Sequence, residues 1–372
     1  PTQQSVRELR SVGIQPDVIV CRADCEIPDE VKDKIALFGD VDPEAVIPLP
    51  TAQTIYEVPL ILEAEGLGEY ITRHLDLKTA PPDLRRWESL VEHIKAPRRS
   101  IRIAIVGKYV ELHDAYMSVT ESLTHAALAH NVNLDLVWIS SETVSDEEMD
   151  RELRKVSGVV VPGGFGPRGT EGKILAAKFA REHQLPYFGL CYGLHMAVIE
   201  VARNVCGLEG ANSTEIDPET PAPVIALMPS QHGVDMGGTM RLGLWPCRLE
   251  PGTKTQAAYD ETMIHERHRH RFEVNNDYRE QLAKAGLIAS GVSPDGHLVE
   301  IMELKDHPFF VGVQFHPEFR SRPTRPHPLF RDFIGAAAQT LPEGAQRSLP
   351  LNGAVNIAVA PEPVLAGAAS EA

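Results

Sequence analysis

The chain has 372 residues, which is long enough for two domains with hydrophobic cores of their own. Its apolar content of 43% and charged content of 24% are ordinary for a globular protein, and its formal net charge of −16 argues against nonspecific binding to nucleic acid or to an anionic membrane. The five cysteines are scattered, and no apolar stretch is long enough for a signal peptide or a membrane span. We therefore expect a cytoplasmic protein.

The first hundred residues alternate between strand and helix patterns. Strands are expected at residues 17–21, 35–38 and 45–49, and helices at 6–12, 31–34, 51–66 and 84–94. This alternation predicts a parallel sheet flanked by helices. Cys21 and Cys25 have the spacing of half a metal site, but no second pair of ligands follows them, so we expect no metal in this chain.

Composition divides the chain into parts. Residues 96–100 are basic and contain a proline, which favours a linker between one domain at 1–95 and another at 101–340. Residues 341–372 are rich in Ala, Pro, Gly and Ser and lack periodic apolar spacing, so this tail is expected to be disordered.

The second domain also alternates strands and helices, which predicts an α/β fold with a mostly parallel sheet. Strands are expected at 101–109, 134–139, 159–161, 186–190 and 311–315, and helices at 116–130 and from residue 192. Gly107 and Lys108 end the first of these strands. They do not form a phosphate loop, because the glycine spacing of such a loop is absent.

A candidate nucleophile follows the strand at 186–190. The chain there reads Gly-Leu-Cys-Tyr-Gly, and an apolar pattern of helical spacing begins at once. Gly189 and Gly193 would let the backbone cross itself at a tight turn and leave Cys191 projecting from it. The N-terminus of the following helix favours a thiolate. A buried structural cysteine is the alternative for this motif alone.

Two further motifs supply partners for a nucleophilic cysteine. Pro317 keeps His316 out of a helix, and in an extended chain Glu318 lies on the same side as His316 and can orient its imidazole. The glycine-rich turn at 162–166 offers free amides that, with the amide of Tyr192, could form an oxyanion hole. Taken alone, His-Pro-Glu is more often an ordinary turn.

In this order, the glycine turn, the cysteine elbow and His-Pro-Glu resemble the class I glutamine amidotransferases over residues 100–335. The resemblance implies a catalytic triad of Cys191, His316 and Glu318, with ammonia released from glutamine through a thioester. It also implies that Gly164 and Tyr192 stabilise the oxyanion.

The first hundred residues resemble a more specific family. Pro-Thr-Gln-Gln-Ser-Val-Arg-Glu-Leu-Arg at 1–10, Val-Lys-Asp-Lys-Ile-Ala-Leu-Phe at 31–38 and Thr-Ile-Tyr-Glu-Val-Pro at 54–59 resemble the synthase domain of the CTP synthase family. By this resemblance Pro1, Thr2 and Gln3 line the pyrimidine nucleotide site and Lys34 contacts the nucleotide. A solvated lysine at a helix end is the alternative for Lys34.

The same resemblance assigns the glutamine site. Glu215 in Asn-Ser-Thr-Glu pairs with the α-ammonium of glutamine, although Ser213 or Thr214 could instead cap a short turn. Arg271, in a run of three histidines and three arginines at 265–271, holds the carboxylate, and the arginines of that run disfavour a metal. His195 stands where the family has a glutamine that helps to hold the substrate. Residues 236–243 are expected to form a hairpin.

The resemblance implies an enzyme that aminates UTP to CTP with ammonia from glutamine. ATP and Mg²⁺ would activate UTP, GTP would act as an allosteric activator with Arg168 as a candidate contact, and the assembly would be a homotetramer. It also implies that the chain lacks the first part of the synthase domain, so that it hydrolyses glutamine without forming CTP. A free-standing glutaminase and a regulatory relative with weakened catalysis are the alternatives.

Overall fold

The computed structural model describes residues 1–228 and 240–340, and the chain divides between Pro97 and Arg98 into two compact units. Much of the predicted hairpin at 236–243 and the tail at 341–372 lie outside the described residues. No helix of the described part is long and apolar enough to cross a membrane.

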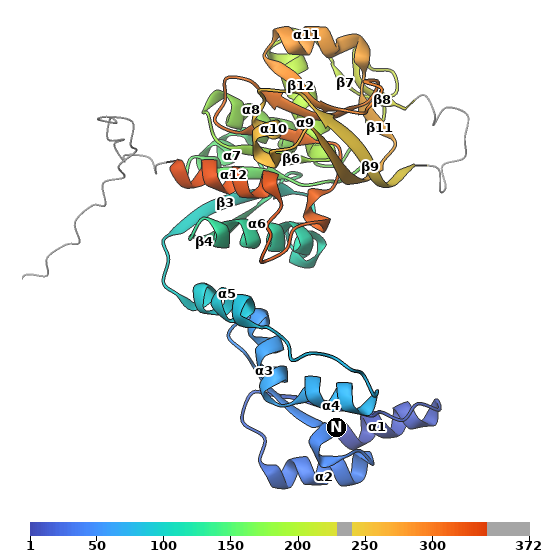
Figure 1. Ribbon diagram of the computed structural model, residues 1–372. Helices are drawn as coiled ribbons and strands as arrows, with labels where there is room; N and C mark the ends of the chain where they lie inside the picture. The colour runs from blue at the N-terminus through green and yellow to red at the C-terminus, as the bar shows by residue number, and fades with distance from the viewer. Residues whose placement is uncertain (229–239, 341–372) are drawn as a thin grey trace, which may run out of the picture. The chain divides into compact units, whose positions relative to one another are not determined.

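The first unit is a small α/β unit built on two parallel strands (Figure 1). Its strands are β1 (Ile19–Ala23) and β2 (Val46–Pro50), and its helices are α1 (Thr2–Ser11), α2 (Asp29–Gly39), α3 (Val58–Ala64), α4 (Leu67–His74) and α5 (Arg85–Lys95). The parallel pairing, with Ile19 opposite Val46, agrees with the predicted alternation. Gly66 has a φ of +79° and separates α3 from α4, a helix that the sequence pattern did not predict.

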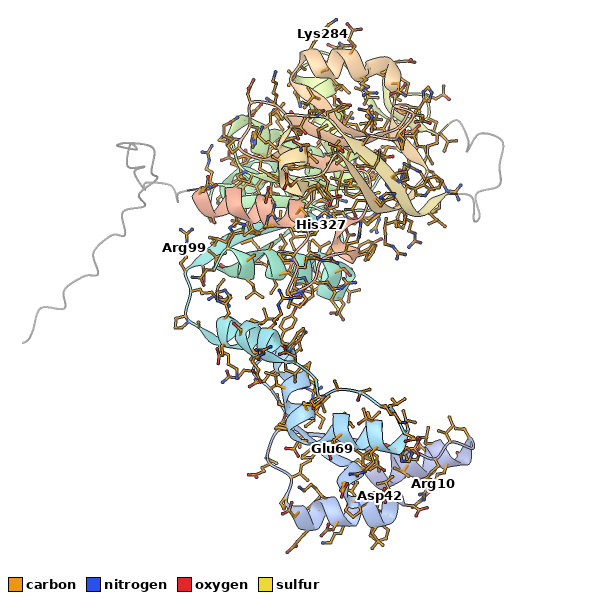
Figure 2. The ribbon with its side chains drawn as sticks, viewed as in Figure 1. Arg10, Asp42, Glu69, Arg99, Lys284 and His327 are labelled. Atoms are coloured by element: carbon orange, nitrogen blue, oxygen red, sulfur yellow. The ribbon has the colours of Figure 1, made fainter. Side chains whose placement is uncertain are left out.

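The packing of this unit ties α1 to the two strands and to α2. Val6 of α1 packs in one cluster with Ile19 and Val46 of the strands. Arg10, labelled in Figure 2, donates from its guanidinium to the carbonyl of Gly39 at 2.6 Å and so ties α1 to the end of α2.

The predicted strand at 35–38 is wrong, because these residues lie inside α2. A run of four apolar residues fits a buried strand or a helix equally well, and periodicity alone cannot separate them. In the structure Leu37 and Phe38 are 75% and 57% exposed, whereas Ala36 faces the core. Asp40, at a φ of 50°, ends the helix in the left-handed conformation.

The second unit contains a nine-stranded sheet in the order β10-β9-β12-β13-β14-β6-β5-β3-β4. Its strands are β3 (Ser100–Gly107), β4 (Asn133–Ser140), β5 (Gly158–Val161), β6 (Tyr187–Leu190), β9 (Arg241–Leu249), β10 (Met263–His270), β12 (Leu287–Val292), β13 (Val299–Leu304) and β14 (Phe310–Val313). From β14 to β4 every pairing is parallel, as predicted, and the other half is an antiparallel extension. A separate sheet pairs β7 (Asn212–Ser213), β8 (Pro223–Leu227) and β11 (Phe272–Val274).

Helices cover both faces of the parallel half (Figure 1). The helices of this unit are α6 (Met117–Ala129), α7 (Asp146–Leu153), α8 (Thr170–Glu182), α9 (Tyr192–Asn204), α10 (Lys254–Tyr259), α11 (Arg279–Lys284) and α12 (Pro328–Gln339). Along β3, Ile103 and Ile105 face the cluster that includes α6 and α12, whereas Ala104 and Val106 face the cluster that includes α7, α8 and α9. This burial on both faces explains why the strand reads as a continuous apolar run.

Candidate active site

The cysteine elbow forms where β6 ends and α9 begins. Cys191 stands between them with φ 48° and ψ −96°, a conformation that costs a non-glycine residue about 1–3 kcal/mol. A Cβ on Gly193 would lie 2.2 Å from the carbonyl oxygen of Val161, and one on Gly189 would lie 2.6 Å from the backbone of Gly193. The two glycines therefore permit the close backbone crossing that the sequence predicted.

The parallel pairing of β6 with β14 brings the second motif to the cysteine. Val313 pairs with Leu190, and the amide of Cys191 donates to the carbonyl of Val313 at 2.6 Å. The chain then leaves β14 towards His316, whose Nδ1 lies 2.7 Å from Oε1 of Glu318. Residues 317–319 form a 3₁₀ turn and not the extended segment that was expected. The turn still brings the imidazole and the carboxylate together.

The environment of His316 favours its protonated form. Burial by itself would lower the pKa of His316. The hydrogen bonds with Cys191 and Glu318 and the charges of both groups outweigh burial, so the pKa of His316 is raised to about 10. An imidazolium beside a sulfur atom is the arrangement that a thiolate–imidazolium pair requires. His316 is thus suited to protonate a leaving group.

The glycine turn at 163–166 packs directly on this pair. A Cβ on Gly163 would lie 3.1 Å from Cε1 of His316, whereas one on Gly164 would face Nζ of Lys173 at 3.2 Å and the ring of Tyr192 at 3.7 Å. The Tyr192 hydroxyl donates to the carbonyl of Gly166 at 2.7 Å. Gly163, which the sequence reasoning did not single out, is therefore the glycine that adjoins the reacting groups.

Glu215 contacts the glycine turn, and Arg271 belongs to a segment that passes close to Cys191. The amide of Gly166 donates to Oε1 of Glu215 at 2.9 Å, and burial raises the pKa of this carboxyl group. Arg271 follows β10, and the carbonyl of Arg269, two residues earlier, lies 4.0 Å from the Cys191 Sγ. The structure thus brings the glycine turn to Glu215 and the end of β10 to the nucleophile.

His195 contacts the nucleophile through an intermediary. It is 3% exposed, and burial lowers its pKa to about 4, so the ring is neutral at physiological pH. Its Nε2 lies 3.0 Å from Oε1 of Gln314, and the Gln314 amide donates to the Cys191 Sγ at 3.7 Å. Gln314 was not identified from the sequence as a site residue, because it stands among apolar strand residues. Its position two residues before His316 is the signal that could have identified it.

Arg168 and the residues predicted to contact the nucleotide belong to other parts of the chain. Arg168 pairs with Glu142 at 3.2 Å on the surface. Lys34 is exposed on α2, and Pro1, Thr2 and Gln3 begin α1, all in the first unit. A cavity of about 430 Å³ beside the start of α8 is lined by residues such as Thr170 and Arg203, and none of the predicted triad lines it.

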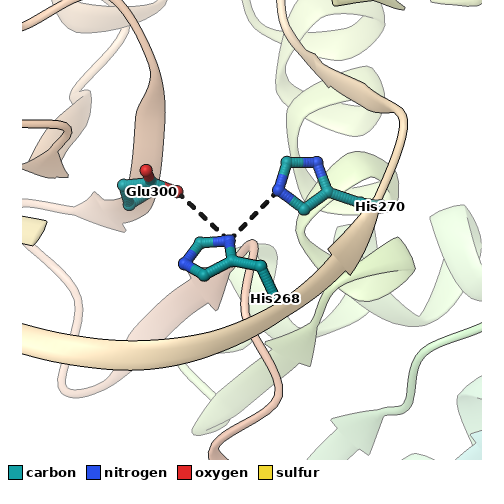
Figure 3. A group of neighbouring side chains, drawn as sticks. All are labelled: His268, His270 and Glu300. Carbon is teal, nitrogen blue, oxygen red and sulfur yellow. Dashed lines mark hydrogen bonds and ion pairs between the residues drawn. The ribbon is translucent and has the colours of Figure 1, made fainter. Parts of the chain in front are cut away.

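A second polar cluster joins two histidines of β10 to Glu300 of β13, in the antiparallel half of the sheet (Figure 3). Nδ1 of His268 lies 3.1 Å from Nε2 of His270 and 3.6 Å from Glu300, distances compatible with a shared metal ion. However, Arg241 pairs with the other carboxylate oxygen of Glu300 at 2.7 Å. Burial lowers the pKa of both histidines, and the charge of Arg241 adds to this effect. The cluster is therefore better described as an internal ion pair with two neutral imidazoles.

The chain is similar to proteins of known family and structure. The family model described as "Glutamine amidotransferase class-I" matches residues 111–336, and that described as "CTP synthase N-terminus" matches residues 1–77. The chain is 66% identical over 351 residues to a CTP synthase of Thermomicrobium roseum, covering 94% of this chain, and 63% identical over 363 residues to one of Roseiflexus castenholzii, covering 96%. A solved glutaminase domain of a Trypanosoma brucei CTPS, with bound acivicin, is 40% identical at a TM-score of 0.62 and covers 64% of this chain and 94% of that one.

The comparisons also test the expectation about the first unit. The matched segment spans 64% of the length of the Thermomicrobium roseum protein and 65% of the Roseiflexus castenholzii protein. The expectation that the chain lacks the first part of the synthase domain is overturned by the match of the N-terminal family model to residues 1–77, and it is withdrawn.

Proposed function

Since this chain belongs to the class-I glutamine amidotransferase family, we propose that its second unit hydrolyses glutamine to glutamate and ammonia. The observation that carries the proposal is the position of His316 between Cys191, on a strained elbow, and Glu318. A strained, non-glycine residue at the junction of a strand and a helix is typical of a nucleophile held for attack.

The proposed reaction has two stages. The Cys191 thiolate attacks the side-chain carbonyl carbon of glutamine, and the carbonyl oxygen becomes an oxyanion that accepts hydrogen bonds from the amides of Gly164 and Tyr192. His316 gives its proton to the departing nitrogen, so that ammonia leaves and a thioester remains. His316 then removes a proton from water, the hydroxide attacks the thioester carbon, and glutamate and the thiolate are released.

Two residues are proposed to hold the ends of glutamine. The carboxylate of Glu215 would pair with the α-ammonium, and the planar guanidinium of Arg271 would bind the α-carboxylate in a bidentate manner. His195 supports this pocket indirectly, because its ring orients Gln314, whose amide contacts the Cys191 Sγ. Its neutral ring leaves the thiolate–imidazolium pair undisturbed.

The ammonia is proposed to aminate UTP at the expense of ATP, in the presence of Mg²⁺, to form CTP. Support comes from the match of residues 1–77 to the CTP synthase N-terminus and from the identity to CTP synthases. We assign Pro1, Thr2, Gln3 and Lys34 to the pyrimidine nucleotide. The 372 residues contain no Gly-x-x-x-x-Gly-Lys-Ser/Thr phosphate loop. We therefore assign no residue of this chain to the binding of ATP or Mg²⁺. Activation by GTP through Arg168 and assembly as a homotetramer belong to the same proposal.

The decisive experiment replaces the nucleophile. Cys191→Ala is expected to abolish ammonia release from glutamine, because the variant cannot form the thioester. Cys206→Ala is the matched control: this cysteine lies just beyond the end of α9, and its replacement should leave the rate unchanged. Substantial ammonia release by Cys191→Ala would rule out the assignment. CTP formed from UTP, ATP, Mg²⁺ and glutamine would support the synthase part of the proposal, and ammonia without CTP would restrict it to hydrolysis.

A further inference from the structure

Lys173 is a buried cation that the reaction described above does not use. It lies in the first turn of α8, its side chain is 0% exposed, and its Nζ has no hydrogen-bond partner among the described residues. Lysine is almost never fully buried without a partner, because removing an ammonium group from water is costly. Such a group indicates a role that compensates for this cost.

The surroundings of Lys173 connect it to the oxyanion loop at 163–166. Its Nζ lies 4.9 Å from the ring centroid of Tyr192, and a Cβ on Gly164 would lie 3.2 Å from the same atom. The hydroxyl of Tyr192 in turn lies 3.2 Å from Thr170 and donates to Gly166. The lysine therefore packs behind the two residues whose amides are assigned to the oxyanion.

We propose that Lys173 is a positioning residue of the glutaminase: its ammonium holds the Tyr192 ring and the glycine turn in place and favours the negative charge that develops on the substrate oxygen. This inference rests on the proposed function. Lys173 touches neither glutamine nor the reacting atoms in this scheme. It acts through Gly164 and Tyr192 and through the field that its charge creates in the protein interior.

Burial and the charged groups around Lys173 bring its pKa into the pH range in which enzyme assays are usually run. Burial is the main cause that lowers its pKa to about 7, and the positive charge of Lys108 adds to this effect. Glu142 and Cys191 act in the opposite direction, and Tyr192 offers the face of its ring. A negative charge on the substrate oxygen would favour the ammonium further, so the lysine supports the anionic intermediate most in its protonated form.

The first test separates positioning from binding. Lys173→Met keeps the length of the side chain and removes the charge, and at pH 6.5 it is expected to lower kcat for glutamine hydrolysis about 10- to 100-fold while KM changes less than about threefold. Lys178→Met, on the same helix but partly exposed, is the matched control and should keep wild-type kinetics. Equal kcat values for wild type and Lys173→Met would overturn the inference. A wild-type protein that releases no ammonia would contradict the proposed function instead.

The second test uses pH. The ratio of wild-type to Lys173→Met kcat/KM should be largest below pH 7 and should approach 1 as the lysine loses its proton above that pH. A ratio that does not change between pH 6 and pH 9 would contradict the role of the charge.

Stability gives an independent readout. The pKa of Lys173 is lowered on folding from 10.5 to about 7, so the buried charge destabilises the folded protein below pH 7, and this cost disappears as pH rises towards 10.5. Lys173→Met should therefore melt at an equal or higher temperature than wild type, with the largest gain at low pH. A variant that melts lower, or does not fold, would make Lys173 a structural residue and overturn the inference.

Discussion

At the scale of single residues, the contact of His316 with Glu318 favours the protonated form of His316, the proposed catalytic acid and base. Glu318→Gln keeps a hydrogen-bond acceptor but removes the negative charge, so the pKa of His316 should fall from about 10. Because the imidazolium must protonate the leaving nitrogen, the upper limb of the kcat/KM profile should move to lower pH, and activity should drop about 10- to 100-fold. Glu280→Gln, on the surface of α11, is the control. An unshifted upper limb would contradict this account of His316.

His195 carries the second prediction at this scale. The resemblance places glutamine here, and a longer amide side chain should restore direct contact with the substrate, so His195→Gln is expected to lower the KM for glutamine and to leave kcat within about threefold. The structure adds a mechanism, because an amide at this position can still hydrogen-bond Gln314. Steady-state kinetics on glutamine provide the measurement. An unchanged KM, or a loss of activity, would mean that the pocket has been rebuilt around histidine.

At the scale of secondary-structure elements, the elbow depends on the close contact of α9 with β5. A Cβ at position 193 would lie 2.2 Å from a backbone carbonyl that cannot rotate away, so Gly193→Ala should lower the free energy of unfolding by about 3 kcal/mol or more and abolish glutaminase activity.

The matched control for the elbow is Gly252→Ala. This glycine has a φ of +77° and open space around it, so its replacement should cost about 1 kcal/mol and leave the activity intact. Chemical denaturation of the three proteins measures the difference. Similar costs at positions 193 and 252 would show that the elbow tolerates a side chain.

At the scale of the whole molecule, the division between Pro97 and Arg98 separates the unit that we propose hydrolyses glutamine from the residues that match the CTP synthase N-terminus. The three residues of the proposed triad all lie in the second unit, which contains two hydrophobic cores of its own. Cleavage by trypsin after Lys95, the last residue of α5, should therefore leave a fragment that still hydrolyses glutamine at about the rate of the intact chain. A fragment without activity would indicate that the first unit completes the site.

The sequence alone determined the α/β class, the strands of the parallel half and the order of the three motifs. These features are local: glycines at fixed spacing allow one turn, proline keeps one residue out of a helix, and strands buried on both faces read as continuous apolar runs. Ile35–Phe38 shows the limit of this reasoning, because a short apolar run does not reveal whether a helix or a strand buries it.

The tertiary structure decided which side chains face one another. The pairing of β14 with β6 places His316 beside Cys191, and the packing of α8 under the glycine turn leaves Lys173 buried with no hydrogen-bond partner among residues 1–228 and 240–340. Gln314 became a partner of both His195 and Cys191 for the same reason. Residues more than a hundred positions apart meet because strands pair in a register set by the whole sheet, and no local pattern in the sequence records that register.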